Sequence, residues 1–170
     1  FSFAWSEAMS SSTASIQAGA VITSAGRVNV TARNTNSLET TAQPLEIGTS
    51  KGGSYSASEL ISTAAAIVNT DINTAGDVMI EAASITTKHS NSVTSDPSNI
   101  LTEAKDKYQE LIGKPKELNA IDASAAVGIT RSTQEATAYI GRDATIIAAG
   151  DVSVSAKIED NFQYGATSEA

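Results

Sequence analysis

Apolar and polar residues alternate along three short stretches of the chain. In residues 24–33, SAGRVNVTAR, the apolar residues Val28, Val30 and Ala32 are separated by Asn29 and Thr31. Residues 74–83, TAGDVMIEAA, and 148–157, AAGDVSVSAK, follow the same pattern after the same Ala-Gly pair. Because successive side chains of a β-strand point to opposite faces, a period of two predicts strands that are buried on one face.

The three stretches belong to a longer repeat. Their Ala-Gly pairs begin at residues 25, 75 and 149, so the intervals are 50 and 74 residues. Residues 13–32 also align with residues 137–156 at a constant offset of 124. Such repeats of short strands are typical of a β-solenoid, in which equivalent positions of successive coils stack. We expect an all-β fold with repeat copies at about 1–44, 55–95 and 122–161.

The repeat length also suggests the size of the coils. Coils of roughly 20 to 25 residues would place two coils in each 50-residue unit and about seven in the chain. Gly26, Gly76 and Gly150 lie where one strand ends and the next begins, and glycine permits the positive φ of a sharp corner. An antiparallel up-and-down arrangement would instead require hairpin turns such as Asn-Gly, which the sequence does not contain.

Residues 95–119 interrupt the repeat. Asp96 suits an N-cap, Pro97 suits the first helical position, and Gly113 can end a helix. Between them the apolar residues recur at helical spacing: Ile100, Leu101, Ala104, Tyr108, Leu111 and Ile112. The second interval exceeds the first by 24 residues (74 minus 50), close to the length of this segment. We expect an α-helix at about 97–112, inserted at a coil corner, and a loop in residues 49–60.

Composition narrows the classes of partner. The net charge is −8, and the chain has no basic run to bind nucleic acid or an anionic membrane surface. There is no cysteine, which excludes disulfides and thiolate metal sites. No apolar run approaches the roughly 18 residues of a membrane span, so we expect no membrane insertion. The chain starts at Phe1 without a recognisable signal peptide, and we expect residues 1–170 to be one solenoid segment of a longer protein.

Few residues are available for catalysis. His89 is the only histidine and lies in a polar stretch, TTKHSNS, which we interpret as a surface loop. The carboxylate pairs that a glycosidase or lyase would need are Asp71 with Asp77, Asp143 with Asp151, and Glu159 with Asp160. Asp77 and Asp151 occupy one repeat position, where the first copy has Arg27, and this indicates a solvated corner. We expect the chain not to be an enzyme, with no catalytic residue and no cofactor.

Other kinds of site remain as alternatives. Solenoid corners rich in Asp and Gly can bind calcium, but residues 69–77 and 139–144 match such corners only faintly, and we assign no metal ligand. An ice-binding face would need a regular threonine ladder, whereas Thr40-Thr41 and Thr86-Thr87 do not recur at the repeat spacing. The aromatic residues gather at the two chain ends, which resemble each other: Phe1, Phe3, Trp5, Phe162 and Tyr164. We expect them to fill equivalent interior or groove positions, with core filling favoured and a carbohydrate-stacking surface as the alternative.

The repeats resemble those of large bacterial secreted adhesins, the filamentous haemagglutinin-like and leukotoxin-type filamentous adhesins. The resemblance covers most of the chain and is carried within residues 123–156 by the following positions: Ala138, Tyr139, Ile140, Gly141, Ala149, Gly150, Asp151, Val152, Val154 and Ala156. It implies a right-handed parallel β-helix that is extracellular or on the bacterial cell surface. It transfers no catalytic residue.

We therefore expect a structural or adhesive segment of an extended β-helical protein, serving as a stalk or adhesin rod. Its partners would be flanking repeats of the same chain or end-to-end copies of itself, and host-cell or matrix glycans or proteins. One alternative is a carbohydrate-binding or carbohydrate-modifying β-helix. The other is a self-assembling subunit of an extracellular filament or sheath.

Overall fold

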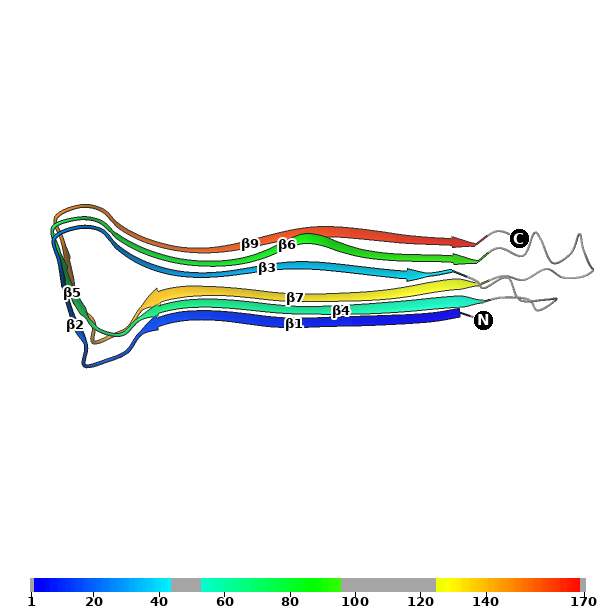
Figure 1. Cartoon of the computed structure of the whole chain (residues 1–170), viewed down its shortest axis with the longest axis horizontal. Coiled ribbons are helices and arrows are strands. Elements are labelled where there is room, and N and C mark those ends of the chain that lie inside the picture. Colours follow the sequence, from blue (N-terminus) through cyan, green and yellow to red (C-terminus); the bar gives the residue numbers. More distant parts are fainter. Residues whose placement is uncertain (1, 44–52, 96–124, 169–170) are drawn as a thin grey trace, which may run out of the picture.

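The described part of the chain folds into three stacked coils of β-strand (Figure 1). The computed structural model describes residues 2–43, 53–95 and 125–168. The first coil contains β1 (Ser2–Ile16), β2 (Val21–Ser24) and β3 (Val28–Ala42). The second contains β4 (Ser54–Val68), β5 (Asp71–Thr74) and β6 (Val78–Ser95), and the third contains β7 (Ala126–Ile140), β8 (Ile146–Ala148) and β9 (Val152–Ser168).

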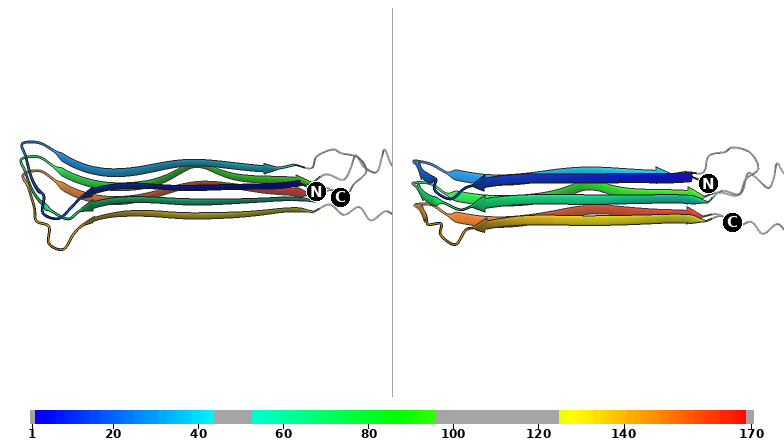
Figure 2. Two further views of the ribbon diagram at one scale, coloured as in Figure 1. Left: turned by 60° about the horizontal axis from the view of Figure 1, so that its bottom comes forward. Right: turned by 90° about the horizontal axis from the view of Figure 1, so that it is seen from below.

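All strand pairs are parallel and connect equivalent positions of successive coils. The strands form three sheets, in the orders β1-β4-β7, β2-β5-β8 and β3-β6-β9. The two sheets of long strands face each other, and the short sheet joins them at one end, as Figures 1 and 2 show. The expected all-β fold of stacked parallel strands, typical of a β-solenoid, is confirmed.

The described ranges contain no α-helix. The helix expected at 97–112 falls on residues 96–124, which lie outside those ranges. No helix long and apolar enough to cross a membrane is present in the described part of the chain.

The expected coil size is wrong. Each repeat forms one coil, and the described residues form three coils, because the long strands have 15 to 18 residues. The alternation does not stop where the apolar residues stop. In β3, for example, Asn34 and Thr40 are buried on the same face as Val30 and Ala32. Polar residues on that inward face lengthen each strand beyond the apolar pattern.

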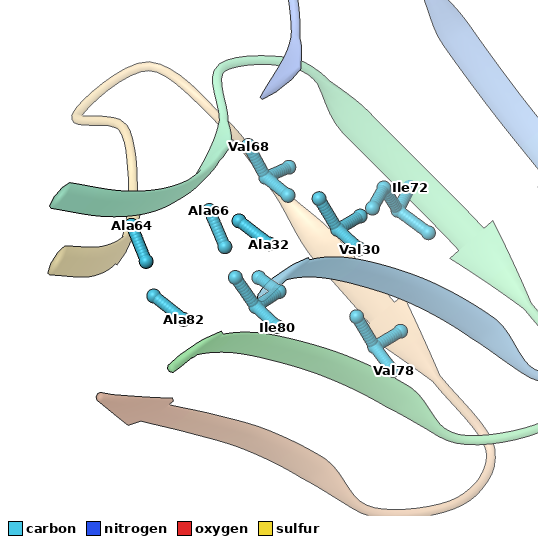
Figure 3. Packing of buried hydrophobic residues seen from close by; sticks show 9 residues of the cluster. All are labelled: Val30, Ala32, Ala64, Ala66, Val68, Ile72, Val78, Ile80 and Ala82. Carbon is cyan, nitrogen blue, oxygen red and sulfur yellow. The ribbon is translucent and has the colours of Figure 1, made fainter. Parts of the chain in front are cut away.

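The apolar part of the interior is built from ladders of equivalent residues, seen in Figure 3. Val78 lies between Val28 and Val152, and both neighbours are in register with it. Val78, Ile80 and Ala82 are 0% exposed, because the second coil has a neighbour on each side. Small residues such as Ala64, Ala66 and Ala82 allow the two long sheets to approach closely at this end. The stacking of equivalent positions expected from the repeat is confirmed, and its apolar ladders consist of Val, Ile and Ala.

The corner glycines are required for close approach between coils. Their expected positive φ is wrong: among the described residues only Gly19 has it, at 88°. A Cβ on Gly76 would lie 2.7 Å from both the Arg27 nitrogen and the Gly26 carbonyl carbon in the preceding coil. A Cβ on Gly150 would lie 3.1 Å from the Asp77 nitrogen. The repeated glycine therefore lets one coil corner rest on the backbone of another.

One irregularity changes which residues of β6 face inward. Asn36 of β3 pairs with Thr86, but the next residue, Ser37, pairs with Lys88. Thr87 is thus the extra residue of a β-bulge, which inverts the inward and outward positions that follow it. Side-chain hydrogen bonds hold the bulge: the Thr87 hydroxyl donates to the Asn36 carbonyl, and the Thr87 carbonyl accepts from the Asn161 side chain, both at 3.0 Å.

The expected loop at 49–60 is wrong for its second half. Residues 44–52 lie outside the described ranges, but β4 begins at Ser54. Ser54, Ser56 and Ser58 occupy alternate inward positions of β4 and are all buried. Serines that suggest a loop by composition are in this case the interior face of a strand.

Candidate functional site

The interior half that lies away from the short sheet is polar. Serine, threonine and asparagine side chains occupy many of its inward positions, with Leu60, Val93 and Ala42 buried among them, and the polar side chains hydrogen-bond across the gap between the two long sheets. Asn34 donates to the Ser10 hydroxyl at 2.9 Å, and Ser10 donates to Asn36 at 2.6 Å. The Ser6 and Thr40 hydroxyls also bond to each other across this gap.

The polar interactions continue from coil to coil. Asn36 donates to the Ser62 hydroxyl at 2.8 Å, Ser62 and Ser84 lie 2.6 Å apart, and the Ser84 hydroxyl donates to Gln134 at 3.2 Å. Ser62 and Ser84 are at most 1% exposed. Buried polar groups are costly unless paired, and loss of one partner costs about 1–3 kcal/mol. This network therefore fixes how the two sheets align.

His89 lies inside this polar region. It is 0% exposed, its Nε2 lies 3.1 Å from the Ser58 hydroxyl, and the Phe162 ring packs edge-on against it at 5.6 Å. The interpretation of His89 as a surface-loop residue is wrong, because the bulge at Thr87 turns it inward. Burial lowers the pKa of His89 below its usual 6.5, and the nearby Asp160 carboxylate partly opposes this shift.

The Ser58–His89 pair does not have the geometry of an activated nucleophile. A serine nucleophile requires a histidine that is held on its other nitrogen by an acid, and a substrate must reach the hydroxyl. The Nδ1 of His89 has no hydrogen-bond partner among the described residues, and Ser58 is only 3% exposed. The pair instead joins β4 to β6 within the interior.

The carboxylates singled out at the corners link successive coils. Asp71 accepts from the Thr145 backbone N–H at 2.8 Å, and Asp77 accepts from the Asp151 N–H at 3.1 Å. The second oxygen of Asp77 pairs with the Arg27 guanidinium at 3.0 Å. The Asp151 N–H, followed by Arg27, lowers the pKa of Asp77 below its usual 3.8. Asp77 thus contacts both neighbouring coils.

The remaining carboxylates do not converge. Glu159 and Asp160 are adjacent in β9, so their side chains point to opposite faces. Glu159 pairs with Lys157, which lowers its pKa, whereas Asp160 accepts from the Ser132 hydroxyl at 3.1 Å. Asp143 and Asp151 lie in the corners before and after β8. Within residues 2–43, 53–95 and 125–168, no three His, Cys, Asp or Glu residues form a group that could hold a metal ion.

The aromatic residues at the two ends lie in different sheets and point in different directions. Phe3 and Trp5 of β1 are 62% and 55% exposed on the outer face, contrary to the expected interior position. The Phe3 ring stacks on Tyr55 of β4, with centroids 5.4 Å apart and the planes 2° from parallel. Phe162 and Tyr164 of β9 occupy inward positions beside His89 and Asn91. The two ends are therefore not structurally equivalent; Phe1 lies outside the described residues.

We call this outer-face group of Phe3, Trp5 and Tyr55 the aromatic patch. Ala57, which pairs with Trp5, is 3% exposed, although it lies on this outer face. Ile129 of β7 stands in register on its other side and is 53% exposed. Exposed apolar surface therefore continues beyond the aromatic patch to β7. Of the threonines weighed for an ice-binding face, Thr40 and Thr86 are buried, so these two cannot contribute to such a face.

The polar interior and the bulge are the features that sequence reasoning missed. The sequence does indicate the polar interior, because Asn34, Asn36 and Thr40 follow Val28 and Val30 at intervals of an even number of residues and so face the same side of a strand. The sequence does not indicate the bulge, because one extra residue in β6 becomes visible only when its neighbours are in register.

Comparison with known proteins returns no match: no protein-family profile, no curated protein and no solved structure is significantly similar to this chain.

Proposed function

We propose that this chain is a structural and adhesive segment of an extended, right-handed β-helical protein on the bacterial cell surface or outside the cell. The observation that carries the proposal is the register of the coils. Each long strand of the second coil pairs along its length with the equivalent strands of the first and third coils. Because every added coil repeats the same contacts, this architecture supports a rod of any length.

The division of the interior supports a mechanical role. Apolar ladders hold the coils together near the short sheet, and the polar network aligns the two long sheets along the rest of their length. Hydrogen bonds and side-chain packing thus act at every coil rather than at one centre. This distribution suits a stalk better than it suits a catalytic cleft.

The aromatic patch supports the adhesive part of the proposal. Solvent-exposed aromatic rings on a rigid face provide apolar contact area at a small entropic cost, and they can stack on sugar rings or pack on protein side chains. Phe3 and Trp5 are exposed although interior positions lie one residue away on the same strand. Contact with host-cell or matrix glycans or proteins is the function that we propose for this face.

Location can be tested with antibodies raised against the chain and applied to intact cells of the source organism. We expect labelling of intact cells that external protease removes. Labelling that requires permeabilised cells, with none in the medium, would contradict an extracellular location.

Adhesion can be tested with the purified chain on immobilised matrix proteins and on a glycan panel. We expect Trp5→Ser to reduce binding at least several-fold, and Val21→Thr to leave it unchanged, because Val21 is 77% exposed but lies on the short sheet. Equal binding by Trp5→Ser and the unmodified chain, both with the same circular dichroism spectrum, would refute a role for the patch.

A further inference from the structure

Among the described strands, those of the first and third coils each have one side that pairs with no other strand. We define the leading edge as the side of β1, β2 and β3 that pairs with no described strand, and the trailing edge as the corresponding side of β7, β8 and β9. Each edge presents strand backbone along the full length of a coil, and exposed strand edges readily pair with another chain. On the trailing edge the inward residues Val152 and Val154 remain 47% and 43% exposed, although their ladder partners Val78 and Ile80 are fully buried.

We propose that the leading edge binds the trailing edge of a second copy of this chain, in the register that the coils use within one chain. The proposal rests on the proposed function, because it extends the same coil stacking across a molecular boundary. Leading-to-trailing contact is the arrangement that keeps every strand pair parallel. It is also heterologous, so it can add copies in a line.

Gly26 provides the first support. A Cβ on Gly76 would collide with the first coil, and one on Gly150 would collide with the second. A Cβ on Gly26 would meet no atom within 4 Å, and Gly26 has no positive φ. Within one molecule nothing in the described structure requires glycine there. If a trailing edge stacked on the leading edge, Gly150 and Asp151 of the second copy would lie against Gly26. A Cβ at residue 26 would then collide with them, and glycine would be required there.

Charge complementarity provides the second support. Glu7, Glu59 and Arg131 occupy one outward ladder, and Arg131 pairs with Glu59 at 3.4 Å. Glu7 therefore faces a like charge within the chain. In the proposed stack it would lie against Arg131 of the second copy, at the spacing of about 4.8 Å between paired strands.

The corner ladder is complementary in the same way. Arg27, Asp77 and Asp151 succeed one another at one corner position, and Arg27 pairs with Asp77. Stacking would place Asp151 of the second copy on the other side of Arg27. One ladder opposes the stacking, because Lys157 of the second copy would lie against Arg33. The repulsion between these two cations is reduced by Glu159, which pairs with Lys157. Within one chain the pKa of Glu159 is lowered by Lys157 and, less strongly, by Arg33. That carboxylate would lie beside both cations.

The apolar ladders would also continue. Val152 would meet Val28, and Val154 would meet Val30, so the valine ladder would extend without a break. Burial of these half-exposed side chains favours association, since each square ångström of apolar surface removed from water contributes about 25 cal/mol.

The first experiment is sedimentation velocity of the purified chain over a wide range of concentrations. We expect the unmodified chain to form assemblies whose mass rises with concentration. Gly26→Ala should assemble only at concentrations at least several-fold higher, because its methyl group would overpack the interface, while its circular dichroism spectrum is unchanged and it melts, at low concentration, at or slightly above the unmodified chain. Gly165→Ala is the matched control: its Cβ also meets nothing within 4 Å, but it points to the outer face of β9, and it should assemble normally.

The second experiment identifies the register by cross-linking, because the chain contains no cysteine. In the double variant Thr31→Cys/Ser155→Cys the two residues lie two coils apart in one chain, about 9.6 Å, which is too far for a disulfide. In stacked copies, residue 31 of one chain and residue 155 of the next would lie about 4.8 Å apart, so oxidation should give disulfide-linked oligomers of increasing size. Thr31→Cys/Glu159→Cys, four residues out of register, should give no such oligomers.

The possible outcomes separate the two proposals. A well-folded chain that stays monomeric at all concentrations would overturn the stacking proposal and leave the rod proposal standing, with another part of the same polypeptide as the neighbour of the leading edge. Cross-linking by Thr31→Cys alone would indicate leading-to-leading contact and would also overturn it. A chain without β-structure would contradict the proposed function itself.

Discussion

The glycine at the coil corner gives a direct test of how closely the coils stack. Gly76→Ala adds a methyl group 2.7 Å from two backbone atoms of the preceding coil, whereas ordinary van der Waals contact begins at 3.4 Å. These atoms cannot rotate away as the end of a side chain can, so the coils must separate at this corner. Overpacking of this kind costs about 1–3 kcal/mol. The alanine also restricts the unfolded chain, which returns about 0.4–1 kcal/mol.

The net expectation is a destabilisation of about 1–2 kcal/mol, or roughly 2–8 °C in Tm for a chain of this size. Gly26→Ala is the control, since its methyl group meets nothing within 4 Å, and it should melt at or slightly above the unmodified chain. Thermal melts followed by circular dichroism, at a concentration where the chain is monomeric, measure both. Equal melting of Gly76→Ala and Gly26→Ala would refute the close stacking of the corners.

Three further predictions concern the interior and the corners. Val78→Asp should destabilise the chain by roughly 3–5 kcal/mol in urea unfolding, because it places an uncompensated carboxylate at a fully buried position; Val152→Asp, in the same ladder but 47% exposed, should cost much less. The pKa of His89 is lowered on folding, so the free energy of unfolding should fall as the pH drops below 6.5, and His89 should cause no pH dependence above that value. Urea unfolding at about pH 7.5 and about pH 5.5 should show this decrease. His89→Gln should remove the part of the pH dependence that His89 causes. The pKa of Asp77 is also lowered, so the stabilisation by its carboxylate is present above pH 3.8 and is lost as the pH falls below it. The difference in melting temperature between Asp77→Asn and the unmodified chain should disappear in that acid range. A difference that persists there would contradict a stabilising role of the Asp77 charge.

The repeat made the stacked ladders predictable from sequence. Val28, Val78 and Val152 align because each coil presents the same backbone and the same small apolar residues to its neighbours, and this periodicity is a local property of the sequence. The repeat also predicted that Arg27, Asp77 and Asp151 lie at a solvated corner, because one repeat position holds charges of both signs. It could not give the number of residues in a coil, because the polar inward positions of β3 and β6 resemble surface residues in composition.

The errors at His89 and Phe3 have a common cause. In a strand, one residue of shift exchanges the interior and exterior faces. Thr87 makes that shift in one coil only, and it buries His89, Asn91 and Val93. Phe3 is apolar but has outward parity, whereas Ser2 and Ser6 have inward parity. Hydrophobicity alone therefore assigns the wrong face at these positions, and only the register resolves them.

The most direct test of the three-coil stack is the set of methyl contacts made by Val78 in solution. Nuclear Overhauser spectra of a methyl-labelled chain should connect Val78 to both Val28 and Val152, because the three residues stand in register in parallel strands about 4.8 Å apart. Cross-strand contacts of the backbone should follow the parallel pattern along β3, β6 and β9. Contacts from Val78 to only one of the two valines, or an antiparallel pattern between these strands, would contradict the account.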